Sequence, residues 1–297
     1  MRKYKRIIHF IWNHPLGRRH LLRVFGRMVA WQIQSSLRKD VLIEKTFIGP
    51  VRFYARKGLT GITGNIYTGL HEFYDMAFLL HFLRPGDLFF DIGANVGSYS
   101  LLASGVCRAS TIAMEASSET AGLLSANVAL NQLGARVSVI HAAAGPAKGT
   151  IRFSLSGDTQ NHVLPRDQVM QESFETVPVL TVDSLSEDEQ PRLIKIDVEG
   201  FETEVMNGMP VTLLQPGLKA IIIELNGSGG RYGFDEREIH ERLLACGFRP
   251  YTYCPFKHEL TLLETYGPFN TIYCRDLPFI SQRLIFATRF EIMGEKI

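Results

Sequence analysis

Short apolar runs alternate along much of the chain with segments in which apolar residues recur every three or four positions. The first pattern predicts buried strands, and the second predicts helices that bury one face. The expected strands are 88–91, 110–115, 136–141, 193–197 and 218–225. The expected helices are 72–83, 118–133, 201–207 and 235–246. Strands that alternate with helices in this way are typical of a parallel sheet covered by helices.

Further strands are expected outside this alternation. Loose alternation over 41–54 predicts a small hairpin. The segments 150–155 and 175–182 flank a polar loop, 156–162. Two more strands, 248–254 and 270–275, follow the last core helix, and 279–292 has the apolar spacing of a helix.

The loop at 91–97, Asp91-Ile92-Gly93-Ala94-Asn95-Val96-Gly97, interrupts a strand and leads into a helix that begins at Ser98. At the end of a parallel strand, such a loop presents bare backbone and a helix N-terminus to a ligand. Gly93 lets the chain turn where a Cβ would clash. We therefore expect this loop to hold a nucleotide-like cofactor.

The residues between the glycines distinguish the cofactor classes. A dinucleotide fingerprint, G-x-G-x-x-G, would need glycine at the positions of Asn95 and Ser98. It would also bring a pyrophosphate close to Asp91, and the two negative charges would repel each other. S-adenosylmethionine has no phosphate, and its ammonium and sulfonium groups suit a carboxylate.

A second carboxylate follows at a suitable distance. Glu115 ends the next expected strand, about 20 residues beyond the loop, where an acid can accept hydrogen bonds from the ribose hydroxyls of an adenosine. Asp91, Gly93, Gly97 and Glu115 together favour S-adenosylmethionine. The alternative is that Asp91 only caps the following helix and Glu115 is a solvated strand end.

The block 194–202, Ile-Lys-Ile-Asp-Val-Glu-Gly-Phe-Glu, ends the fourth core strand. In an open parallel sheet, ligands bind outside the carboxyl ends of the strands, where the strand order reverses. Asp197 and Glu199 are therefore expected beside Asp91 and Glu115. Two carboxylates could also bind a divalent metal ion.

The blocks 90–97 and 194–202, in this order and about a hundred residues apart, resemble the FkbM family of S-adenosylmethionine-dependent methyltransferases. The resemblance runs from about 72 to 275. It implies an α/β, Rossmann-like class I methyltransferase fold with a mostly parallel seven-stranded sheet, an antiparallel last strand and helices on both faces. The segments 248–254 and 270–275 would then be the antiparallel pair that closes the sheet. The family pattern requires no metal, and we expect none.

The resemblance also implies the reaction, which is O-methylation of a hydroxyl on a sugar, glycan or secondary metabolite. The base that takes the hydroxyl proton is expected to be Asp197 or Glu199, with His162 of the polar loop as the next candidate. Glu72 would face the methionine end of the cofactor or the substrate, although a glutamate at a helix N-terminus is also explained by the helix dipole.

Asn95, Asn127, Ala143 and Asp197 complete the expected cofactor-binding residues. Methyltransferases of this fold often have an acid after the third strand that binds the adenine amino group. This chain has Ala142-Ala143-Ala144 there instead. Adenine must then be held by backbone groups or by another segment, for which Asp158 and Asn161 are candidates. The glycine-rich segment 226–232 is expected to form a lid over the acceptor.

The chain has 297 residues, of which 45% are hydrophobic and 21% charged, as in an ordinary globular protein. Its four cysteines show no metal-ligand spacing, which favours reduced thiols and a cytoplasmic protein. We expect a basic helical segment, an N-terminal hairpin with a lead-in helix, one catalytic domain and a helical tail, at 1–40, 41–86, 87–275 and 276–297.

The net charge of +2 hides a strong asymmetry. Residues 1–39 contain ten lysines or arginines and no acid, whereas the rest of the chain has 22 basic and 30 acidic residues. The acidic body argues against nucleic acid as a partner, and a small molecule or glycan acceptor is expected instead. The apolar stretches in 1–39 are too short for a membrane span or a signal peptide. They predict an amphipathic helix that lies on the domain or makes peripheral contact with a membrane.

Two other functions remain open from the sequence. A nicotinamide-dependent oxidoreductase would share the Rossmann-like fold, although Asn95 and Ser98 count against it. A non-catalytic cofactor-binding or scaffold protein would retain the loop at 91–97 without turnover. The acceptor and the oligomeric state are not indicated by the sequence.

Overall fold

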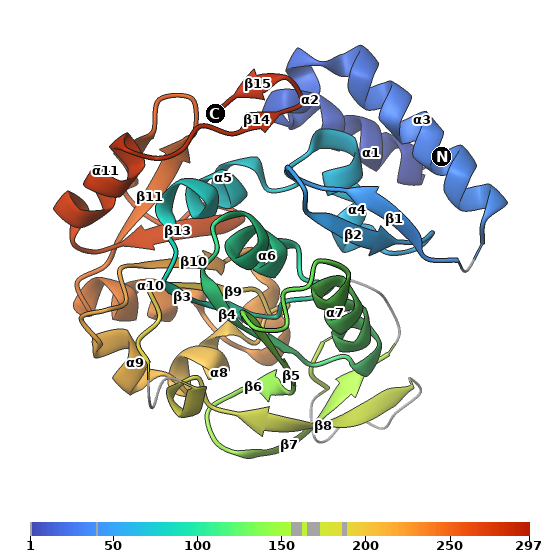
Figure 1. Ribbon diagram of the computed structural model, residues 1–297. Helices are drawn as coiled ribbons and strands as arrows, with labels where there is room; N and C mark the ends of the chain where they lie inside the picture. Colours follow the sequence, from blue (N-terminus) through green and yellow to red (C-terminus); the bar gives the residue numbers. More distant parts are fainter. Residues whose placement is uncertain (1, 40, 156–161, 165–172, 186–188) are drawn as a thin grey trace.

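The computed structural model describes residues 2–39, 41–155, 162–164, 173–185 and 189–297. Within this part of the chain, an eight-stranded mixed sheet is covered by helices, and three small sheets surround it (Figure 1). The predicted α/β class is therefore confirmed.

Five parallel strands form the centre of the large sheet. They are β3 (Leu88–Ile92), β4 (Ser110–Glu115), β5 (Val137–His141), β9 (Leu193–Ile196) and β10 (Ala220–Glu224). Their spatial order is β5-β4-β3-β9-β10. The chain order therefore reverses between β3 and β9, which is where ligands bind in open parallel sheets.

The sheet continues beyond β10 with strands that run in both directions. β13 (Asn270–Cys274) pairs antiparallel with β10, and β11 (Arg249–Cys254) pairs antiparallel with β13. These seven strands have the predicted arrangement, with the last one antiparallel. An eighth strand, β12 (Glu259–Leu262), was not expected, because it is short and mostly exposed at the sheet edge, where no buried face gives it a pattern.

Two hydrophobic clusters lie on opposite faces of this sheet. One cluster includes Phe89, and α5 (Phe73–Phe82), the π-helical segment 102–106 and α7 (Ser118–Leu130) pack side chains into it. The other includes Phe90 and receives α8 (Glu202–Asn207), α9 (Pro210–Leu214) and α10 (Glu236–Ala245). Neighbouring residues of a strand point to opposite faces, so the run of apolar residues in β3 serves both clusters.

The N-terminal segments pack onto the first of these clusters. They comprise α1 (Arg2–Asn13), α2 (Pro15–Arg19), α3 (Leu21–Leu37), the hairpin of β1 (Ile43–Thr46) and β2 (Arg52–Ala55), and α4 (Thr60–Thr68). Ile11, Val24 and Trp31 are buried in the same cluster as Phe89. Residues before β3 therefore share the hydrophobic core of the large sheet.

The expected helix at 279–292 is only partly correct. The chain forms α11 (Leu277–Ile285) and then a hairpin of β14 (Glu291–Ile292) and β15 (Glu295–Lys296), which lies beside α2 (Figure 1). Met293 and Gly294 both have positive φ, of 58° and 88°. Two consecutive residues with positive φ form the tight hairpin turn that ends any helical continuation.

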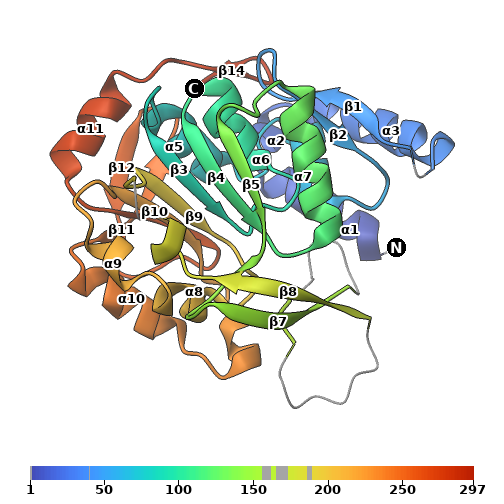
Figure 2. The same cartoon turned by 60° about the horizontal axis from the view of Figure 1, so that its bottom comes forward.

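An inserted sheet follows β5. It consists of β6 (Ala143–Ala144), β7 (Gly149–Ser154) and β8 (Phe174–Leu180), so the two predicted strands of this region are confirmed. Figure 2 shows β7 and β8 side by side beyond one end of β5. Two short 3₁₀ turns, Asp183–Leu185 and Ser228–Tyr232, complete the described elements, together with α6 (Ser98–Leu101). Among the described helices, none is long and apolar enough to cross a membrane.

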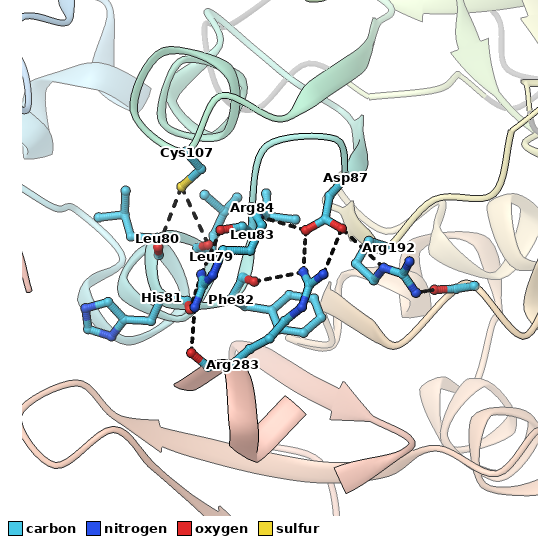
Figure 3. Close-up of polar contacts among 11 residues, drawn as sticks. Leu79, Leu80, His81, Phe82, Leu83, Arg84, Asp87, Cys107, Arg192 and Arg283 are labelled. Carbon is cyan, nitrogen blue, oxygen red and sulfur yellow. Dashed lines mark hydrogen bonds and ion pairs between the residues drawn. The ribbon is translucent and has the colours of Figure 1, made fainter. Parts of the chain in front are cut away.

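Asp87 joins three parts of the chain immediately before β3 (Figure 3). Its Oδ2 accepts a hydrogen bond from the Arg84 backbone N–H at 2.8 Å, which fixes the turn after α5. Its carboxylate also pairs with Arg192 at the start of β9 and with Arg283 of α11. Asp87 is only 6% exposed, so this pairing is shielded from water.

We expect Asp87→Asn to lower the free energy of unfolding by about 2 kcal/mol. Breaking a fully buried pair costs ~3–5 kcal/mol, and the partial exposure of Arg192 and Arg283 reduces this. Urea denaturation measures the change. Glu44→Gln is the control, because both partners of the ion pair between Glu44 and Arg52 are exposed and such a pair contributes little. Equal midpoints for Asp87→Asn and wild type would contradict the role of Asp87.

Candidate functional site

A cavity of about 360 Å³ lies at the carboxyl ends of β3, β4, β9 and β10. This volume is in the range of small-molecule sites. Its charged lining residues are six acids and one lysine, namely Glu72, Asp91, Glu115, Asp197, Glu199, Glu224 and Lys195. The excess of carboxylates suits a ligand with positive charge.

Asp91 both lines the cavity and caps a helix. Its Oδ2 accepts hydrogen bonds from the backbone N–H of Ser100 at 3.0 Å and from the Ser100 hydroxyl at 2.6 Å. Burial raises the pKa of Asp91 to about 6, although the bonds from Ser100 and the charge of Lys195 oppose this rise. Asp91 thus stabilises the first turn of the helix and also lies in the cavity wall, and its contact with the cofactor stays a prediction.

The glycines of the loop let neighbouring segments approach more closely than a side chain would allow. A Cβ on Gly93 would lie 1.8 Å from the backbone oxygen of Asp197, so only glycine lets the tips of β3 and β9 meet. Gly97, with φ of 92°, precedes α6, and a Cβ there would lie 2.4 Å from Leu124 Cδ1. Gly93 lines the cavity, whereas Gly97 shapes the loop from outside the lining.

Glu115 is buried at the end of β4, which excludes the interpretation of a solvated strand end. Its Oε1 accepts from the Ser117 N–H at 2.9 Å and from the Thr120 hydroxyl at 2.8 Å, and its Oε2 accepts from the Asn95 N–H at 2.8 Å. Burial raises its pKa despite these bonds. A carboxylate has about four acceptor positions, so about one remains for a ligand hydroxyl.

Lys195 is a cavity residue that the sequence analysis missed. It is 3% exposed in β9, its Nζ donates to Asp197 Oδ2 at 2.7 Å, and the same nitrogen lies 4.9 Å from the centre of the Tyr99 ring. Burial alone would lower its pKa, but Asp197 and Glu72 outweigh that effect and raise it. The signal in the sequence was a charged residue inside an otherwise apolar buried strand, which requires a partner.

Glu199 and Glu224 are two cavity carboxylates whose pKa lies well above the ordinary value. Burial, together with the negative charges of Asp197 and Glu202, raises the pKa of Glu199 to about 7. Burial and then Asp197 raise the pKa of Glu224 to about 8. Glu199 has φ of 54°, an uncommon backbone conformation for a non-glycine residue that is often found at functional sites.

Glu72 enters the cavity wall from the start of α5. Its Oε2 accepts from the Tyr99 hydroxyl at 2.7 Å, its Oε1 accepts from the Asn270 side-chain amide at 2.6 Å, and it makes no capping bond to its helix. The adjacent His71 also lines the cavity and was missed from sequence. Burial lowers the pKa of His71, so its ring is neutral near pH 7.

Three of the predicted residues, Gly97, Asn127 and His162, lie outside the cavity lining. Asn127 is fully buried, and its amide donates to the Val96 carbonyl at 2.8 Å and accepts from the Tyr54 N–H at 2.7 Å. Asn127 therefore does not line the cavity, because its polar atoms hold β2 and the loop against α7. His162 is also outside the lining, and its backbone N–H donates a hydrogen bond to Ser154 Oγ at 2.9 Å.

The remaining predicted residues divide as follows. Asn95 and Ala143 line the cavity, together with Ala142 and Ala144. Asp158 and Asn161, the weaker candidates for binding adenine, lie outside the described residues. No group of three or more histidines, cysteines or acids placed to hold a metal ion occurs in the part of the chain that the structure describes.

Comparison with known proteins identifies the family. A hexuronic acid methyltransferase, AglP, from Haloferax volcanii is 26% identical over 168 residues, which are 56% of this chain and 64% of that protein. The chain thus spans just under two thirds of this relative. A precorrin-6Y C5,15-methyltransferase structure from Geobacter metallireducens has a TM-score of 0.40 at 14% identity, covering 74% of this chain and 91% of that one.

The structure of TrmK from M. capricolum with S-adenosylhomocysteine also has a TM-score of 0.40, at 8% identity, and the match covers 68% of each chain. The sequence pattern of the methyltransferase FkbM domain matches residues 91–250, which is more than half of the chain. That stretch contains the loop after β3 and the block after β9. The chain therefore belongs to the FkbM methyltransferase domain family, and its cofactor is S-adenosylmethionine.

Proposed function

We propose that the protein is an O-methyltransferase that uses S-adenosylmethionine to methylate a hydroxyl of a sugar, a glycan or a related small natural product. The observation that carries this proposal is the acidic cavity at the point where the strand order reverses, between β3 and β9. The methyltransferase from Haloferax volcanii, whose name gives a hexuronic acid as its substrate, supports a sugar acceptor.

The lining residues fit the cofactor in charge and in hydrogen bonding. Asp91 is suited to the positively charged methionine end, and the acceptor position left on Glu115 is suited to a ribose hydroxyl. Ala142, Ala143 and Ala144 offer an apolar wall without a side-chain acid, so backbone groups or another segment would have to recognise the adenine. A dinucleotide fits less well, because its pyrophosphate would meet several carboxylates.

The bound cofactor supplies an activated methyl group, so the protein has mainly to align the acceptor and remove its proton. Glu199 is best suited to take that proton, because a base with a pKa near 7 balances ionisation at neutral pH against proton affinity. Asp197 is less suited, since its Oδ2 accepts a hydrogen bond from the buried Lys195 ammonium. The ion pair between Lys195 and Asp197 instead fixes the Asp197 carboxylate at the tip of β9.

We expect Asp91→Asn to weaken binding of S-adenosylmethionine about tenfold or more, because it removes a buried negative charge but keeps an acceptor for Ser100. Asp91 is ionised above its pKa of about 6, so the wild-type affinity should fall as the pH drops through 6. The variant should lack this dependence. Calorimetric titration of both proteins measures the two effects.

The matched control for this titration is Glu259→Gln, an exposed acid of β12 away from the cavity. It should bind the cofactor as the wild type does. Circular dichroism establishes that Asp91→Asn remains folded, since Asp91 also caps α6. Unchanged affinity and pH dependence in a folded Asp91→Asn protein would contradict the role of Asp91.

We expect Glu199→Gln to reduce kcat about 10²–10⁴-fold, which is the usual contribution of a general base. In the wild type, kcat should rise with pH up to about 7, because only ionised Glu199 accepts a proton, and then level off. The acceptor is found first, by mass spectrometry of extracts for a compound that gains one CH₂ unit in the presence of enzyme and cofactor.

Glu224→Gln is measured in parallel, because the pKa of Glu224 lies near that of Glu199. If Glu199→Gln retained the wild-type rate and pH profile while Glu224→Gln lost them, Glu224 would be the base. If wild-type protein bound S-adenosylmethionine but methylated no compound in extracts or in a glycan panel, a cofactor-binding protein without turnover would replace the proposed enzyme.

A further inference from the structure

The outer face of α1 and α3 is apolar although nothing in the described chain covers it. We call it the N-terminal apolar face, and we propose that it docks onto an anionic membrane surface. It consists of the exposed side chains of Ile8, Trp12, Leu22, Val29, Ile33 and Leu37. Leu22 and Leu37 are 92% and 82% exposed, so they are fully available to a partner.

The spacing of these residues places them on one side of each helix. Leu22, Val29, Ile33 and Leu37 are separated by seven, four and four positions, and Ile8 and Trp12 by four, which is helical spacing. The opposite side of α3 is buried through Val24 and Trp31. Figure 1 shows α3 at the outer edge of the molecule. A helix with apolar residues on two opposite sides normally packs against other structure on both sides.

Basic residues stand at both ends of the α3 stripe. Arg18 precedes it and Arg38 and Lys39 follow it, and all three are exposed with no ion pair to any residue that the structure describes. Arg19, beside Arg18, pairs with Glu295 of the C-terminal hairpin. Apolar side chains with flanking cations bind membrane interfaces that contain anionic lipid. Tryptophan, the residue type of Trp12, is enriched at such interfaces.

The charge of this segment decides between possible partners. The first 39 residues carry ten basic residues and no acid. A symmetric dimer through this face would bring two such segments together, and their like charges would repel. Nucleic acid would satisfy the cations but would leave the apolar side chains without a partner. An anionic bilayer satisfies both, so it is the partner that the surface fits.

One of these helices, α1, also touches the wall of the cavity. The ring of Phe10, in α1, lies 4.9 Å from the ring of His71, which lines the cavity. His14 accepts hydrogen bonds at Nδ1 from the N–H groups that begin α2, and its Nε2 donates to the Leu70 carbonyl at 2.6 Å. Docking would therefore hold the cavity close to the membrane, which suits a lipid-linked acceptor if the proposed function is correct.

Vesicle binding tests the docking surface directly. Full-length protein is floated with vesicles of phosphatidylcholine alone or with about one third phosphatidylserine, without cofactor or acceptor. The apolar variant is Leu22→Ser/Ile33→Ser/Leu37→Ser, and the charge variant is Arg18→Gln/Arg38→Gln/Lys39→Gln. We expect wild-type protein to prefer phosphatidylserine vesicles and each variant to bind them at least about tenfold more weakly.

The matched control is Leu214→Ser/Leu262→Ser/Ile285→Ser, because these side chains are 69%, 60% and 68% exposed on other elements. It should bind as the wild type does. Equal binding by wild type and both variants, or no preference for phosphatidylserine, would overturn the proposal. So would a wild-type dimer that the apolar variant converts to a monomer in light scattering, because a second copy would then cover the face. Since the assay contains no cofactor or acceptor, its result is separate from that of the methyl-transfer experiments.

Discussion

The buried ammonium of Lys195 is the interaction on which the cavity depends. The tips of β3, β9 and β10 bring carboxylates together in a space that is largely shielded from water, and their mutual repulsion would oppose folding. Lys195 donates to Asp197 at 2.7 Å and lies against the Tyr99 ring, whose hydroxyl in turn donates to Glu72. One cation thus compensates several anions, and the cavity keeps a net negative character that a sulfonium and an ammonium can use.

The groups that form the cavity are also the groups that hold the fold together around it. Asp91 caps α6, and Glu115 closes the turn into α7 through Ser117 and Thr120. Gly93 allows the backbone of β3 to approach Asp197. Because the hydrogen-bond partners of both acids are backbone groups and hydroxyls of fixed elements, the carboxylates are held in place before any ligand binds. This preorganisation reduces the entropy that binding would otherwise cost.

The N-terminal helices belong to the catalytic unit instead of forming a separate appendage. Their inner side shares the hydrophobic cluster of the sheet, the C-terminal hairpin pairs with them through Glu295, and α1 reaches the cavity wall through Phe10. Their outer side remains apolar and basic. Contacts from both ends of the chain therefore hold this outer face in a fixed position relative to the cavity.

The sequence by itself determined the five core strands, the loop after β3 and the presence of acids at the strand ends, because hydrophobic period and turn residues are local properties. It also pointed to the family through two spaced motifs. It did not reveal Lys195 or His71 in the cavity, and it could not show that Asn127 lies outside the lining. Which side chains share a cavity depends on strand order and on the direction of each side chain, and these are set by packing between distant segments. Only the tertiary structure decided that Asn127 serves the backbone of β2, that the tail ends in a hairpin, and that one lysine balances the carboxylates.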